Sequence, residues 1–168
     1  MKKIQIAKWV MFGLALAANI FILVNGFIVG EASAAESGNI AKFLASIINL
    51  FAPNTINDGN FETFASIMRK LVGHFGLFAV DAVFSTLAIY FFTITKKWYK
   101  FYWLFMMSLG TGLLVAILSE LAQIITPDRV GSWADVGIDF GGYFLGFAIV
   151  ILVLFLSKKL IASKSDNI

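Results

Sequence analysis

The sequence predicts an all-α fold: a polytopic membrane protein with a small bundle of four transmembrane helices and an amphipathic helix on the outer surface. Of its 168 residues, 60% are hydrophobic and 14% are charged, whereas an ordinary soluble domain is about half apolar and a quarter charged. Four apolar stretches also reach the roughly 20 residues that a helix needs to cross a bilayer. We therefore expect a single membrane domain over residues 1–168, with spans at about 9–30, 71–95, 101–125 and 133–156.

The first span, at about 9–30, has an alternative interpretation as a cleavable signal peptide. A basic start precedes it, and Ala32, Ser33 and Ala34 follow it, which is the order of features in such peptides. Its apolar run of about 22 residues is longer than the apolar core of a signal peptide, which has about 7–15. We therefore expect the span to be retained, and cleavage would leave the other three spans oriented as before.

The segment 31–66 is expected to lie outside and to hold the amphipathic helix. Apolar side chains recur at helical spacing from Ile40 to Phe51, with polar side chains opposite them, until Pro53 ends the pattern. Such a helix either caps the bundle or contacts lipid headgroups. The pattern alone does not decide between these two roles.

Lysine residues at three places predict the orientation of the chain, because loops rich in Lys and Arg face the cytoplasm. These lysines precede the first span, separate the second span from the third, and follow the fourth. We therefore expect a multi-pass protein of the cell membrane with both termini in the cytoplasm and the other two connections outside. The lysines are Lys2, Lys3, Lys8, Lys96, Lys97, Lys100, Lys158, Lys159 and Lys164.

Ionisable residues run from the outer end of the second span into its middle. At α-helical spacing, Lys70, His74 and Asp81 share one face. A charged carboxylate in mid-span costs about 2.5–3.5 kcal/mol on insertion scales, so Asp81 should face the bundle interior, protonated or paired. Two roles are open for it: a hydrogen bond to a neighbouring helix through Ser85 or Ser108, or a step in a proton relay.

The fourth span carries a line of small and acidic residues. Asp135, Asp139, Gly142 and Gly146 follow a 4-3-4 spacing that places them on one side of the helix. Glycines let a neighbouring helix approach closely in a membrane. The two carboxylates should therefore face the same neighbour.

The outer ends of three spans, with the turn between the third and the fourth, thus bring a polar site to one level of the membrane. Intramembrane charges also pair for stability, so the alternative is a salt-bridge network that only ties the helices together. The candidate acid–base residues are His74, Glu120 and Asp135, and the candidate ligand-binding residues are Arg69, Lys70, Gln123, Arg129 and Asp139.

The order and spacing of these residues resemble the motifs of the VanZ-like integral membrane proteins, whose founding member is linked to teicoplanin resistance. The resemblance covers about residues 66–146. The chain departs from the usual pattern at Asp139, where the family more often has Asn, and at Phe78, where an aromatic residue with a hydroxyl is common. The resemblance implies a protein of the bacterial cell envelope with a role in glycopeptide resistance, but it does not supply a reaction. It rests on Arg69, Lys70, His74, Glu120, Gln123, Pro127, Arg129, Asp135, Gly142 and Gly146.

Three classes of function are compatible with this site. The first is binding of an anionic lipid, a cell-wall precursor or a glycopeptide-related ligand, with Arg69, Lys70 and Arg129 holding a phosphate or carboxylate. The second is an intramembrane enzyme that acts on a lipid-linked or cell-wall precursor, with His74 as the general acid or base and Glu120 or Asp135 orienting it. The third is a small transporter or proton pathway that uses Asp81.

Composition limits the cofactors and partners. The chain has no Cys and one His, which excludes Cys-ligated and multi-His metal sites. We expect no cofactor, although His74, Glu120, Asp135 and Asp139 form an oxygen-rich set that suits Mg²⁺ or Mn²⁺. Membrane lipids are the expected partners and nucleic acid is not, because the basic residues end apolar runs instead of forming a patch. The glycines that pack a bundle could equally serve a homo-oligomer.

Overall fold

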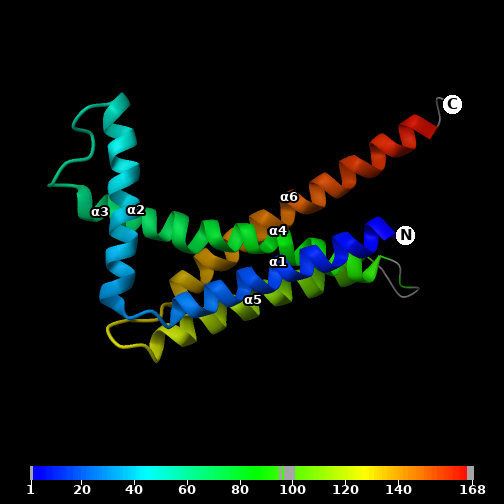
Figure 1. Cartoon of the computed structure of the whole chain (residues 1–168), viewed down its shortest axis with the longest axis horizontal. Helices are drawn as coiled ribbons and strands as arrows, with labels where there is room; N and C mark the ends of the chain where they lie inside the picture. Colours follow the sequence, from blue (N-terminus) through cyan, green and yellow to red (C-terminus); the bar gives the residue numbers. More distant parts are fainter. Residues whose placement is uncertain (1, 95, 97–100, 166–168) are drawn as a thin grey trace.

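The computed structural model describes residues 2–94, 96 and 101–165 (Figure 1). All regular secondary structure in these residues is helical. No strand occurs in these residues, which confirms the predicted all-α class. One segment, η1, is a π-helix. The elements are α1 (Lys2–Gly26), α2 (Gly30–Phe51), α3 (Phe61–Met68), η1 (Arg69–Gly76), α4 (Leu77–Thr93), α5 (Phe101–Ile124) and α6 (Trp133–Ser165).

Within the described residues, four helices are long and apolar enough to cross a membrane: Ile4–Gly26, Phe61–Thr93, Phe101–Ile124 and Trp133–Ser157. The number of spans is as predicted, but the boundaries differ, most of all in the first two spans. The first begins at Ile4 instead of about residue 9. The first helix ends at Gly26 instead of residue 30, and the second begins at Phe61 because α3, η1 and α4 form one continuous helix of 33 residues. A helix of that length is about 50 Å long. It therefore exceeds the roughly 30 Å of a hydrocarbon core.

The helices α1, α4, α5 and α6 form the bundle, and α2 crosses one end of it (Figure 1). The α5–α6 connection lies at this same end, which we call the α2 end. The first turns of α1 and the last turns of α6 lie at the opposite end. The central element is α4, which packs against α1, α5 and α6.

Several lysines that predict the orientation of the chain are not described by the structure. Lys97 and Lys100 lie outside the described residues, as does the expected end of the second span at residue 95. The side chains of Lys2, Lys3, Lys158, Lys159 and Lys164 are not described either.

Two glycines of α6 allow close contact with the helix that contains η1 and α4, as the 4-3-4 line predicts. A Cβ atom on Gly142 would lie 2.1 Å from the carbonyl oxygen of Phe75, and one on Gly146 would lie 2.1 Å from the carbonyl oxygen of Ala79. Both distances are far shorter than any real contact of a Cβ atom. The two backbones therefore pack directly on each other, and this contact holds the first turns of α6 against η1.

Asp81 is fully buried in the bundle, and it connects α4 to α1. The amide Nδ2 of Asn19 donates to Asp81 Oδ1 at 2.8 Å, and the hydroxyl of Ser85 donates to the same oxygen at 2.9 Å. Ser85 is thus a partner, as expected. Ser108 is not, because it bonds to Thr86 instead. The neighbouring helix reached by Asp81 is α1, through a residue that the sequence argument did not consider.

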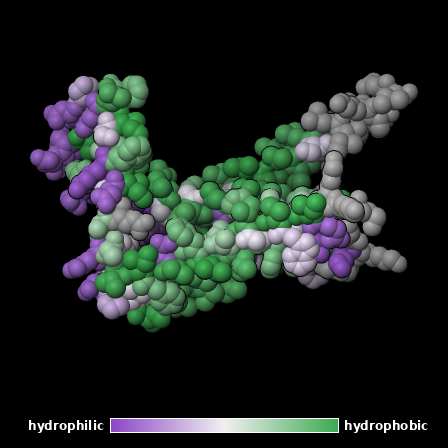
Figure 2. Space-filling model, viewed as in Figure 1, coloured by the Kyte–Doolittle hydropathy of each residue, from purple (hydrophilic) through white to green (hydrophobic). Residues whose placement is uncertain are grey.

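The apolar side of α2 is largely uncovered. Ala41 and Ala45 are buried, but Ile40, Phe43 and Ile47 are exposed, although α2 packs against α3 and slightly against η1. Figure 2 shows hydrophilic residues on the outer edge of the part formed by α2, α3 and the connection between them. Hydrophobic residues lie on the side of this part that faces the bundle body. This distribution favours contact with lipid over the alternative that α2 is a cap packed on the bundle.

Candidate functional site

The π-helical segment η1 places three of the predicted residues, Arg69, Lys70 and His74. In an α-helix, five residues cover about 1.4 turns, so Arg69 and His74 would point roughly 140° apart. In a π-helix, hydrogen bonds join residues i and i+5, so residues five apart lie on nearly the same side. Both Arg69 and His74 line the same cavity. Lys70, four residues before His74, does not line it and pairs with Asp135 of α6.

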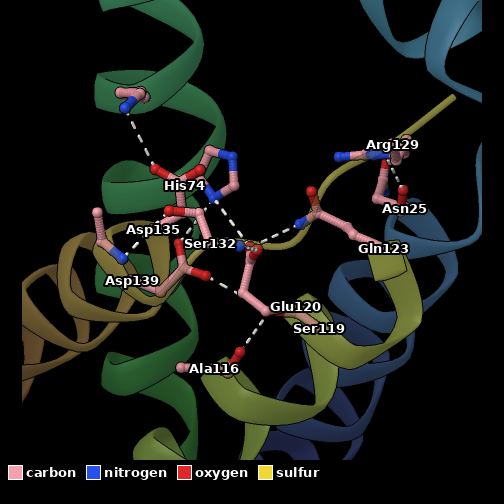
Figure 3. Close-up of polar contacts among 12 residues, drawn as sticks. Asn25, His74, Ala116, Ser119, Glu120, Gln123, Arg129, Ser132, Asp135 and Asp139 are labelled. Carbon is pink, nitrogen blue, oxygen red and sulfur yellow. Dashed lines mark hydrogen bonds and ion pairs between the residues drawn. The ribbon is translucent and has the colours of Figure 1, made fainter. Parts of the chain in front are cut away.

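His74 is held by a carboxylate of α6. Its Nδ1 atom lies 3.0 Å from Asp139 Oδ1, and the hydroxyl of Ser119 on α5 donates to Asp139 Oδ2 at 3.4 Å. The Oε1 atom of Glu120 lies farther from Nδ1, at 3.9 Å. In Figure 3 the other ring nitrogen of His74 points away from these carboxylates. His74 is thus oriented by Asp139, a residue expected to bind ligand, and not chiefly by Glu120 or Asp135.

Glu120 is buried and holds the connection between α5 and α6. Its Oε1 accepts a hydrogen bond from Gln123 Nε2 at 2.6 Å, and its Oε2 accepts one from the main-chain N–H of Ser132 at 2.8 Å. Ser132 in turn caps α6, because its hydroxyl accepts a bond from the N–H of Ala134 at 3.2 Å. Both carboxylate oxygens of Glu120 are therefore occupied by neutral donors of the protein.

Asp135 pairs with Lys70. The Nζ atom of Lys70 lies 3.3 Å from Asp135 Oδ1. This oxygen is buried and makes no hydrogen bond of good geometry, so the ion pair is its contact. Neither residue lines the cavity that His74 faces. The structure therefore divides the predicted residues into this pair and a group around His74.

Arg129, in the α5–α6 connection, has no carboxylate partner within the described residues. Its Nη1 atom donates to the carbonyl oxygens of Asn25 and Ile28 at 3.0 and 3.3 Å and to the hydroxyl of Ser33 at 3.3 Å. These bonds fix the turn between α1 and α2 and all use one nitrogen, so Nη2 and Nε have no hydrogen-bond partner among the residues that the structure describes. One nitrogen of Arg129 is directed toward the side on which His74 and Gln123 lie (Figure 3).

The charge of Arg129 lies near that of Arg69. Burial lowers the pKa of the Arg129 guanidinium, and the positive charge of Arg69 lowers that pKa further. An arginine still remains protonated at neutral pH. Arg69 is exposed and makes no hydrogen bond or ion pair with any described residue. Two guanidinium groups therefore approach each other with unused donors, and an anion near both would relieve their repulsion.

These groups line one side of a cavity of about 210 Å³ at the α2 end. Its polar lining includes Arg69, His74, Gln123, Arg129 and Asp139. Its apolar lining comes from α1, α2, η1 and α4. The cavity is thus a space with cationic groups at its polar side and apolar walls, which suits an amphipathic molecule that carries an anionic group.

A metal ion at this site would be bound by His74 together with carboxylates of α5 and α6. Within the described residues, His74, Glu120 and Asp139 offer one ligand atom each, and these atoms lie within 4.8 Å of one another. Asp135, the fourth residue of the oxygen-rich set, is not in this group. Binding of Mg²⁺ or Mn²⁺ would replace the hydrogen bonds that His74, Ser119, Gln123 and Ser132 already supply to the carboxylates.

Sequence reasoning missed the neutral residues that orient the charged ones. Ser119 acts through its hydroxyl, Ser132 through its main-chain N–H and Asn25 through its main-chain carbonyl oxygen. Groups of these kinds occur at every helix end. Ser119 lies one residue before Glu120, and only the register of α5 against α6 selects it. No sequence pattern within α5 distinguishes it from Ser108, which serves the bundle core.

The comparisons with known proteins agree with this architecture. No curated protein and no solved structure matches the chain. The model of the family described as VanZ/LLP1 matches residues 9–155. This match contains η1, α5, the α5–α6 connection and the first turns of α6, which together supply the charged groups of the cavity. Because the match covers most of the 168 residues, the chain is a multi-pass membrane protein that belongs to the VanZ/LLP1 family.

Proposed function

We propose that this protein binds an anionic group, a phosphate or a carboxylate, in the cavity at its α2 end. The observation that carries the proposal is the distribution of partners. Glu120 and Asp139 are bonded to neutral donors or to His74, and Asp135 pairs with Lys70, while Arg69 and Arg129 have no carboxylate partner among the described residues. A network that only ties helices together would use its strongest bidentate donors on its own acids. Here those donors are left for a ligand.

The α2 end faces the outside of the cell in this proposal. The lysines near the opposite end, including Lys8 and Lys96, support that orientation through the bias of cytoplasmic loops toward basic residues. A cavity on the outer side suits ligands such as anionic lipids and cell-wall precursors. It also suits a contribution to glycopeptide resistance, because teicoplanin-type drugs act outside the membrane.

Arg69→Gln provides the cleanest test, because Arg69 has no bond whose loss would destabilise the fold. The measurement is thermal unfolding of the purified protein in an uncharged detergent, with inorganic phosphate or phosphatidylglycerol added in steps. Both should stabilise the wild-type protein, because a ligand that binds only the folded state raises its stability. One lost charge-assisted bond contributes about 1.5–3 kcal/mol, so the variant should bind about 10- to 100-fold more weakly.

Lys42→Gln is the matched control for this test. Lys42 is an exposed cation of α2 that does not line the cavity, so its replacement removes one positive charge without touching the site. Equal responses of Arg69→Gln and wild type would count against the proposal. So would the absence of stabilisation by both probes.

A second candidate function is catalysis by His74. Its Nδ1 is engaged by Asp139 at 3.0 Å, and the other ring nitrogen is turned away from the carboxylates. In a neutral imidazole held this way by a carboxylate, the free nitrogen is a proton acceptor. The test is turnover of a lipid-linked phosphate by purified protein, followed by mass spectrometry. Undiminished turnover in His74→Ala would reject a catalytic role for this residue.

A further inference from the structure

We infer that the ligand of the cavity is a membrane phospholipid, or a lipid of the same design, that enters sideways from the bilayer. This inference rests on the proposed function, since it identifies the source of the anionic group. The phosphate would lie between Arg69 and Arg129, and the acyl chains would leave the cavity between α1 and η1.

The cavity opens between two helices that both belong to membrane spans. α1 packs along α4 and α5, whereas η1 packs against α3, α4 and α6. The two elements are not packed extensively on each other, although both line the cavity. α2 closes this space only from the end of the bundle. The side that remains open therefore faces the hydrocarbon that surrounds the spans.

The exposed residues that line the cavity are Arg69, Gly73 and three apolar side chains. Phe21 of α1, Ile40 of α2 and Val72 of η1 line the cavity and are 51%, 43% and 41% exposed. An opening to water would place apolar side chains at an aqueous boundary, whereas an opening to lipid lets acyl chains cover them. These three exposed side chains can therefore contact acyl chains, while Arg69, also exposed, can contact the phosphate.

The position of α2 fits this path. Its exposed apolar residues include Ile40, Phe43 and Ile47, as in a helix that lies in the interface between headgroups and acyl chains. Ile40 belongs to the hydrophobic side and also lines the cavity. The cavity thus begins at the depth at which lipid phosphates and the first chain carbons lie. A soluble anion would need no such path.

The test narrows the opening without changing the cations. Val72→Trp adds a large side chain at the opening, and Val80→Trp is its control, because Val80 is 51% exposed on α4 and does not line the cavity. Binding of phosphatidylglycerol is measured by native mass spectrometry from nanodiscs that contain phosphatidylglycerol and phosphatidylcholine. Binding of glycerol 3-phosphate, the headgroup phosphate without chains, is measured by thermal unfolding in detergent.

We expect Val72→Trp to reduce phosphatidylglycerol binding at least tenfold and to leave the response to glycerol 3-phosphate within about twofold of wild type. Val80→Trp should change neither. The retained response to glycerol 3-phosphate shows that the variant is folded. If Val72→Trp does not fold, Ile40→Trp narrows the same opening from α2 and replaces it.

The outcomes separate this inference from the proposed function. If lipid binds Val72→Trp and Ile40→Trp as well as it binds wild type, or if glycerol 3-phosphate binds as tightly as the lipid, sideways entry is wrong while anion binding stands. If Arg69→Gln binds both probes as wild type does, the proposed function fails, and the inference fails with it.

Discussion

Replacement of Gly142 by Ala should both destabilise the protein and disturb the site. The new Cβ would lie 2.1 Å from the carbonyl oxygen of Phe75. A main-chain oxygen cannot turn aside as a side chain can, so α6 must move from η1 by roughly 1 Å, and overpacking of this kind typically costs about 1–3 kcal/mol. Asp139 lies one turn away on α6 and bonds to His74 of η1 at 3.0 Å. The same movement would stretch this bond beyond about 3.5 Å, where it no longer counts as a hydrogen bond.

The assay is reversible unfolding of the wild-type protein and Gly142→Ala in mixed micelles, with the free energy of unfolding as the measured quantity. Gly141→Ala is the matched control, because a Cβ on Gly141 would meet only the ring of Phe75 at 3.8 Å, an ordinary contact. That variant should be neutral or slightly more stable, since Ala favours a helix over Gly by about 1 kcal/mol. Equal stability of Gly142→Ala and Gly141→Ala would refute the close packing of α6 on η1.

Two further predictions concern the bundle core and the orientation of the chain. A double-mutant cycle of Asn19→Ala and Asp81→Ala should give a coupling energy of about 0.6 kcal/mol in unfolding experiments, the average for hydrogen bonds between membrane helices, for which the maximum is about 1.7 kcal/mol. A coupling near zero would show that the 2.8 Å contact contributes nothing to stability. Because the chain has no Cys, Asp128→Cys can be labelled on intact cells with a maleimide that does not cross the membrane. We expect labelling from outside for Asp128→Cys and only after permeabilisation for Lys96→Cys, and the reverse pattern would invert the topology.

The fold was predictable from the sequence because a bilayer restricts apolar segments strongly. Four runs of sufficient length imply four spans, and only a helix satisfies their backbone groups at that length. The spacing of Gly142 and Gly146 also predicted which side of α6 meets a neighbour. Boundaries were less predictable. Hydropathy does not reveal that α1 ends at Gly26, because the apolar sequence continues to residue 30, where α2 already begins.

The candidate site was predictable in its members and not in its pairings. Charged residues at the ends of spans identify the level of the site, so the eight predicted residues lie at the α2 end. Which acid meets which base depends on differences of about 1 Å in the packing of three helices. The sequence argument therefore assigned Glu120 or Asp135 to orient His74, while the structure gives this position to Asp139.

The π-helical segment explains how Arg69 reaches the side of His74, which α-helical spacing does not predict. Four-residue spacing groups Lys70 with His74, and it separates Arg69 from both the cavity and His74. The π-helix of η1 instead puts Arg69 beside His74 at the cavity, and Lys70 takes the side of Asp135. Such segments are rare and occur frequently at functional sites.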